Sequence, residues 1–202
     1  MQGIETKILN KIYGSGRGSV FSTDEFLVFG SRASIDKALS RLAQKGKLKR
    51  LARGLYYYPK THPVMGGLSP NPEAVAKALA GKHGIRLQPT GAYAANLLGL
   101  STQVPAKIVF LTDGPGKTVK IDNMEICLKK TTPRNMGAAG KTSGLVIQAL
   151  RYLGKEHVNE DVIKALSRKL NSQDKRQLLK DLQYAPVWVG RHLRRIALGD
   201  RF

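Results

Sequence analysis

The stretch SRASIDKALSRLAQK (31–45), followed by GKLKRLARGLYYYP (46–59), decides the fold of the N-terminal region. In its first part, apolar residues recur at the spacing of one helix face. This apolar stripe consists of Ile35, Ala38, Leu39 and Leu42. Ser31 can cap such a helix, and Gly46 is suited to end it. We therefore expect an amphipathic helix from Arg32 to about Lys45.

The second part of the stretch predicts a β-hairpin. Residues 47–51 and 55–58 are two short runs rich in strand-forming residues. The turn between them, Ala52-Arg53-Gly54, contains the glycine that a tight turn favours.

The sequence upstream predicts two more helices. Apolar residues at helical spacing predict a helix over residues 4–13, which the Gly14-Ser-Gly16 segment ends. Ser22 and Glu25 fit a capping box at the start of a short helix over residues 22–27. Three helices followed by a hairpin within about 60 residues are the arrangement of a winged helix-turn-helix.

The remaining sequence predicts a second region of mixed structure. Residues 61–72 are rich in Pro, Gly and Ser and are expected to be a linker between a domain at 1–60 and a domain at 73–202. In the second domain the patterns predict helices at about 73–82, 90–98, 143–153, 159–170, 172–183 and 186–197. Strands at 106–112, 118–121 and 124–129 are expected to form a small antiparallel sheet. The fold class is therefore α+β.

The charge points to a polyanionic partner. The 202 residues include 34 Lys and Arg against 14 Asp and Glu, which gives a formal net charge of +20. The excess is +8 over residues 1–62, +5 over 63–135 and +7 over 136–202, so it is spread along the chain. With 42% hydrophobic residues the chain can bury a core, so the charge is expected on folded surfaces.

No segment predicts membrane insertion or secretion. The longest apolar stretches are about four residues, whereas a transmembrane helix needs about 20. The first ten residues lack the apolar run of a signal peptide. We expect a cytoplasmic protein without a membrane partner, and the single cysteine, Cys127, fits a reducing compartment.

We find no catalytic or metal-binding constellation in the sequence, and we expect neither an enzyme nor a cofactor. The motif at Gly30-Ser31 resembles that of small nucleotidyltransferases, but the Asp-x-Asp pair that would hold metal ions does not follow. Gly114-Pro-Gly-Lys-Thr118 resembles the end of a phosphate-binding loop, but the first glycine of that motif is replaced by Leu111 and a strand follows. A hairpin turn explains this segment better.

A winged helix-turn-helix places its third helix in the major groove of DNA, where Arg and Lys reach guanine. The predicted helix offers Arg32, Ser34, Lys37 and Arg41 for this role, and Ser31 can donate to a phosphate at the helix start. The predicted wing adds Lys49, Arg50, Arg53 and Tyr56. The alternative interpretation of the same residues is a solvated basic face on a small packing domain.

The succession of motifs resembles the AbiEi-type antitoxins and a related group known as a domain of unknown function. It comprises Arg53-Gly-Leu-Tyr-Tyr57, then TGAYAANLLGL (90–100), then VPAKIVF (104–110). The resemblance covers most of the chain and is clearest over about 1–130. It implies a bacterial antitoxin that represses its own operon through inverted repeats in the promoter and counters a nucleotidyltransferase-like toxin, with or without a stable complex. It also implies DNA contacts by Arg32, Lys37, Arg41, Arg53 and Tyr56.

The sequence leaves a second function open. The basic C-terminal half suits an RNA-binding or protein-interaction module without sequence-specific DNA binding. Equal affinity for RNA and for DNA would favour that interpretation.

Overall fold

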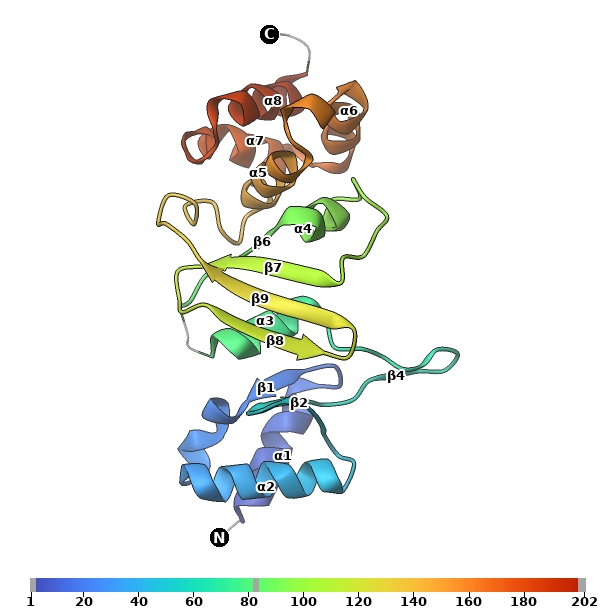
Figure 1. Cartoon of the computed structure of the whole chain (residues 1–202), viewed down its shortest axis with the longest axis vertical. Coiled ribbons are helices and arrows are strands. Elements are labelled where there is room, and N and C mark those ends of the chain that lie inside the picture. The colour runs from blue at the N-terminus through green and yellow to red at the C-terminus, as the bar shows by residue number, and fades with distance from the viewer. Residues whose placement is uncertain (1–2, 82–83, 200–202) are drawn as a thin grey trace. The chain divides into compact units, whose positions relative to one another are not determined.

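The computed structural model describes residues 3–81 and 84–199 and mixes helices with strands, as the sequence predicts. Contacts divide the chain into two compact units. Unit 1 contains the described residues up to 81 together with 119–122, and unit 2 contains the rest (Figure 1). Over the described residues, no helix combines the length and the apolar character that crossing a bilayer requires.

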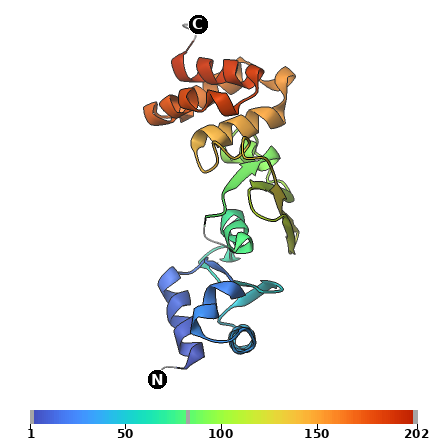
Figure 2. The same ribbon diagram turned by 90° about the vertical axis from the view of Figure 1, so that its left-hand side faces the viewer.

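Unit 1 begins with three helical segments and a small sheet (Figures 1 and 2). Its elements are α1 (Ile4–Ser15), β1 (Val20–Ser22), the 3-10 helix η1 (Thr23–Phe29), α2 (Arg32–Gln44), β2 (Lys49–Ala52) and β3 (Leu55–Tyr57). The predicted capping box is present, because Glu25 accepts a hydrogen bond from the Ser22 backbone N–H at 2.8 Å. The hairpin is confirmed, and β1 adds a third strand that the sequence did not predict.

The core of unit 1 explains why these elements assemble. The buried stripe of α2 is the predicted one, Ile35, Ala38, Leu39 and Leu42. It packs with Ile8 and Ile12 of α1 and with Phe26 of η1, which are fully buried. Burying side chains of this size stabilises a fold by about 1.5–3 kcal/mol each. This packing fixes which face of α2 remains exposed.

Residues 61–72, predicted to be a linker, contain a second hairpin. Its strands are β4 (Thr61–His62) and β5 (Gly66–Gly67), and α3 (Pro72–Ala80) follows. The Asn71 side chain caps α3 by accepting from Glu73 N at 2.8 Å. The segment is therefore structured.

Three strands of unit 2 form a four-stranded sheet with β8 (Lys117–Ile121), of which residues 119–121 belong to unit 1, and the pairing of this sheet corrects the predicted antiparallel arrangement. The strands are β6 (Leu87–Thr90), β7 (Lys107–Thr112), β8 and β9 (Met124–Lys130), in the order β6-β7-β9-β8. β6 pairs antiparallel with β7, but β7 and β9 run parallel from Lys107↔Glu125 to Thr112↔Lys130. The physical reason is that β8 occupies the edge and the chain turns back at residues 122–123, so β9 lies between the two strands that precede it.

Helices complete unit 2. They are α4 (Gly91–Leu97), α5 (Thr142–Leu153), η2 (Lys155–His157), α6 (Glu160–Lys169), α7 (Ser172–Lys180), η3 (Leu182–Tyr184) and α8 (Val187–Leu198). Their core is a continuous apolar cluster that includes Val146, Leu150, Leu166, Leu178 and Leu193. Asp181 is 3% exposed, and its carboxylate accepts hydrogen bonds from Ser143, Lys141 and Gln177. These hydrogen bonds connect the start of α5 with the end of α7.

Candidate nucleic-acid interface

The exposed face of α2 is the first part of the candidate interface. Ser34, Lys37 and Arg41 are exposed because the opposite side of the helix is buried in the core. Among the described residues, no carboxylate forms an ion pair with Lys37 or with Arg41. Both cations are therefore available to an external anion.

The start of α2 is also open to solvent. Ser31 caps the helix, and its Oγ accepts from Ser34 N at 3.4 Å and donates to Ser34 Oγ at 3.0 Å. Both serines are exposed. The positive end of the helix dipole therefore lies at an accessible surface, where an anionic group is favoured.

Arg32 differs from the other basic residues of α2, because two carboxylates hold it. Its Nη1 lies 2.7 Å from Asp24 Oδ1, and its Nε lies 3.2 Å from Asp36 Oδ2. Exposed ion pairs of this kind contribute about 0–1 kcal/mol. A phosphate could therefore displace either carboxylate at little energetic cost. The pairing with Asp36 has a signal in the sequence that was not used to predict it, because Asp36 stands four residues after Arg32, which is the spacing of a helical ion pair.

The β2–β3 hairpin carries the second part of the interface. Lys49, Arg50 and Arg53 are exposed, and Lys49 Nζ lies 3.3 Å from Asp122 Oδ2. Gly54 makes the tight turn possible, since its φ of +72° is a conformation that other residues rarely adopt.

Tyr56 does not have the exposure expected of a DNA contact. It is 3% exposed and belongs to the core of unit 1. Burial raises the pKa of its phenol, an effect that the nearby Arg50 partly offsets. The structure thus makes Tyr56 a neutral packing residue that supports the hairpin from beneath.

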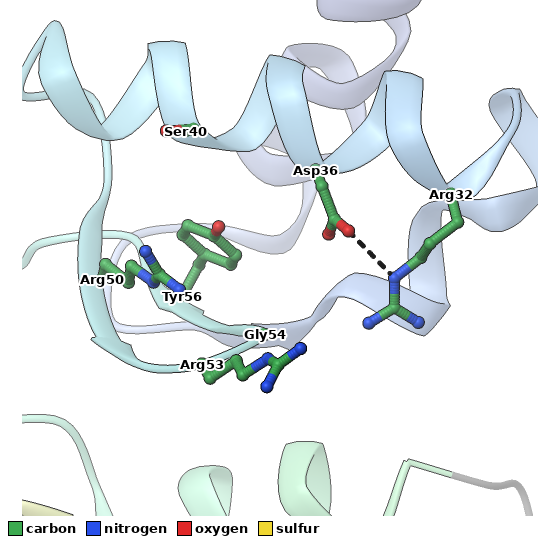
Figure 3. Close-up of a pocket in the computed structure, with 7 residues that line it drawn as sticks. All are labelled: Arg32, Asp36, Ser40, Arg50, Arg53, Gly54 and Tyr56. Atoms are coloured by element: carbon green, nitrogen blue, oxygen red, sulfur yellow. Dashed lines mark hydrogen bonds and ion pairs between the residues drawn. The ribbon is translucent and has the colours of Figure 1, made fainter.

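A groove lies between α2 and the hairpin and brings four of the nine predicted interface residues together (Figure 3). It has a volume of about 520 Å³. Its lining consists of Arg32, Asp36 and Ser40 from α2 and Arg50, Arg53, Gly54 and Tyr56 from the hairpin. With three arginines and one aspartate, the groove favours anions. Lys37, Arg41, Ser31, Ser34 and Lys49 are not part of its lining.

The sequence that follows Asp36 contains basic residues and no acidic ones up to residue 72. Residues 37–72 contain eight Lys or Arg and no Asp or Glu. Such a local field attracts polyanions over a distance of about one Debye length, which is about 8 Å at physiological salt.

The described residues contain no group of three His, Cys, Asp or Glu side chains that could hold a metal ion. His62, His157 and His192 lie in separate elements, and His83 lies outside the described residues. The guanidinium, ammonium and hydroxyl groups that the interface exposes can bind anions.

The comparisons place the chain in a family. Residues 7–178 match the family of unknown function DUF6088, and because this match spans most of the chain, the protein belongs to that family. A search of curated proteins finds no match.

Proposed function

For this member of the DUF6088 family, we propose a sequence-specific double-stranded-DNA-binding function, with unit 1 as a winged helix-turn-helix. In this proposal α2 is the recognition helix and the β2–β3 hairpin is the wing. The order of helices and strands in unit 1 supports it. The observation that carries it is the exposed face of α2, where Lys37 and Arg41 have no carboxylate partner among the described residues and a basic hairpin follows.

The proposed mechanism separates base contacts from phosphate contacts. A helix fits the major groove, which is about 12 Å wide, and there Lys37 and Arg41 would reach guanine edges. Ser31 and Ser34 would hold a phosphate at the start of α2, and Arg50 and Arg53 would contact the DNA backbone beside the major groove. Phosphate contacts fix the register, whereas the base contacts supply the sequence preference.

We extend the proposal to the biological role that the resemblance implies. The protein would be a cytoplasmic, non-enzymatic antitoxin that represses its own operon through inverted repeats and counters a nucleotidyltransferase-like toxin. Two half-sites one helical turn apart, about 34 Å, would accept two copies side by side.

Unit 2 would add further phosphate contacts. Its helices expose basic residues along single faces, with Arg176 and Lys180 on α7 and Arg191 and Arg194 on α8. Within the described residues, none of these four side chains forms an ion pair with a carboxylate. They would strengthen binding without adding sequence preference.

A promoter-reporter experiment tests the proposed function. The DNA upstream of the gene is fused to a reporter, and the wild-type protein or a variant is supplied at equal levels. We expect repression by the wild type and its loss in the Lys37→Ala/Arg41→Ala double variant. Lys7→Ala, which removes an exposed cation of α1, is the control that should still repress. Equal reporter output with and without the wild-type protein would contradict autorepression.

The antitoxin role needs a separate test. Co-expression with the protein encoded by the neighbouring gene should restore growth that this neighbour alone inhibits. A neighbour that is harmless alone, or one whose toxicity persists, would contradict the antitoxin role while leaving DNA binding intact.

A further inference from the structure

The β4–β5 hairpin presents an apolar tip that packing within the chain does not explain. Val64 is 87% exposed and Met65 is 73% exposed, so these are among the most exposed apolar side chains of the described residues. They lie between the two strands of the hairpin, which Figure 1 shows as a thin arm. An exposed Met beside an exposed Val is a feature of surfaces that meet a partner.

The arm is held firmly at its base. Tyr57, which is 3% exposed, donates from its hydroxyl to Leu68 O at 2.9 Å and accepts from Lys60 N at 3.3 Å. Leu68 N also donates to Lys60 O at 2.8 Å. One buried side chain thereby fixes both ends of the arm.

The tip is ordered by its own hydrogen bonds. The Nδ1 atom of His62 accepts from the backbone N–H groups of Val64 and Met65 at 3.3 and 3.4 Å. Gly66 follows with a φ of +70° and returns the chain to β5. A turn held in this way directs the two apolar side chains into solvent before any partner is present, which lowers the entropy lost on binding.

We propose that Val64 and Met65 form a wedge that enters the minor groove of duplex DNA and partly unstacks a base step. This inference rests on the proposed DNA-binding function. Minor-groove proteins frequently insert apolar side chains such as Met between base pairs and bend the duplex. Only the two side chains at the tip need to enter this groove, which is about 6 Å wide.

The charge around the arm favours DNA over a protein partner. The arm itself, residues 61–67, carries neither Lys or Arg nor Asp or Glu, but it directly follows residues 37–60, which contain eight Lys or Arg and no Asp or Glu, and the exposed Lys60 stands at its base. A protein interface typically buries about 800 Å² on each side, far more than two side chains can offer. A wedge needs little area, because the surrounding phosphate contacts supply most of the affinity.

The arm is close enough to the wing to act on the same duplex. His62 follows Tyr57, the last residue of β3, by five residues, which span at most about 17 Å. That is about half of one helical turn of DNA. Arg17 Nη1 donates to Pro59 O at 3.1 Å and ties this connection to the end of α1.

The test uses the full chain and the duplex upstream of its gene, labelled at its ends for energy transfer and carrying 2-aminopurine at successive positions. We expect the wild type to bend the duplex and to raise 2-aminopurine fluorescence at one step. The Val64→Ser/Met65→Ser variant should bind about tenfold more weakly and lose both signals. Its salt dependence should not change, because no phosphate contact is removed. Val104→Ser, which alters an exposed apolar residue of unit 2, should behave as the wild type.

The outcomes separate the two claims. If the variant binds and bends the duplex as the wild type does, the wedge is wrong while the DNA-binding function stands. If the wild type does not prefer this duplex, the proposed function fails and the wedge fails with it. If the wild type self-associates without DNA and the variant does not, the tip docks on a second copy and the wedge is overturned.

Discussion

The basic side chains of α2 differ in whether a carboxylate already forms an ion pair with them. Among the described residues, no carboxylate forms an ion pair with Lys37 or Arg41, whereas Arg32 forms ion pairs with both Asp24 and Asp36. We interpret Arg32 as a residue that orders the groove and exchanges a carboxylate for a phosphate on binding. In the proposed DNA complex, this exchange would make Asp36 a residue that opposes binding.

Replacing Asp36 should therefore strengthen DNA binding. Asp36→Asn removes one negative charge from the groove and releases Arg32, and a unit charge at contact distance in water is worth about 1 kcal/mol. We expect affinity to rise about fivefold in a binding titration at low salt, while the free energy of unfolding falls by less than about 1 kcal/mol. Glu156→Gln removes an exposed carboxylate of η2 and is the matched control. Equal gains in both variants would mean that only net charge matters.

Base reading and phosphate contact can be distinguished at Lys37 and Arg41. If a residue contacts a base, its substitution by Ala should weaken binding by about 1–3 kcal/mol and relax the preference at one base position of the operator. A phosphate contact should instead lower the slope of log K against log salt by about 0.9. We expect the first behaviour for both residues in titrations against single-base variants of the operator. An unchanged operator affinity in both variants would show that α2 is not the recognition helix.

The same residues show what sequence can and cannot predict about a site. The exposed face of α2 was predictable, because helical periodicity fixes which residues are buried. The burial of Tyr56 was not, since β3 is the central strand of the order β1-β3-β2 and β1 contributes only three residues. Tyr57 is buried as well, through a contact with Leu68 that no local pattern encodes.

At the scale of elements, the helices of unit 2 were predicted well and the sheet was not. Helix periodicity is local, whereas the parallel pairing of β7 with β9 depends on where β8 lies. β6 escaped prediction because Pro89 interrupts its strand pattern. Its place at the edge of the sheet is where a proline is tolerated.

The close packing of α5 against β6 at Gly144 leads us to predict an effect on stability. A Cβ atom at Gly144 would overlap Ala138 O and Gln88 Oε1. Gly144→Ala should therefore lower the free energy of unfolding by about 1–3 kcal/mol, as overpacking a core does. In Gly190→Ala the new methyl group meets Leu182 at 3.8 Å, an ordinary contact in α8. This control should be neutral or stabilising by up to about 1 kcal/mol in denaturant unfolding.

Helix α8 makes a prediction about pH. Burial, together with the nearby Arg195 cation, lowers the pKa of His192 below 6.5. Its Nδ1 is buried without a hydrogen-bond partner among the described residues, which fits a neutral ring. The unfolded chain therefore binds the proton more readily. The contribution of His192 to the free energy of unfolding is fully present above about pH 6.5, and it is lost as the pH falls towards the pKa of His192 in the folded protein.

Thermal unfolding at pH 7.5, 6.5 and 5.5 measures this effect. The melting temperature should fall towards pH 5.5, and His192→Gln should flatten the dependence. The exposed His157→Gln variant should keep the dependence of the wild type. Identical pH profiles in all three proteins would rule out His192 as the cause.

For the whole molecule, the net charge of +20 is distributed over both units, so binding should depend on both. Arg191→Ala/Arg194→Ala removes two exposed cations from α8. If each contacts a phosphate, the salt slope should fall by about 1.8 while the preference among DNA sequences stays the same. An unchanged slope would confine the DNA interface to unit 1.

The central claim is that a folded basic surface reads a DNA sequence and does more than attract polyanions. A binding titration of the full chain tests it most directly. It compares the DNA upstream of the gene with scrambled DNA and with a structured RNA at two salt concentrations. We predict a preference of about 1,000-fold or more for the upstream DNA that persists at physiological salt. Equal and steeply salt-dependent binding to all three would contradict the claim, because only non-specific charge would then be acting.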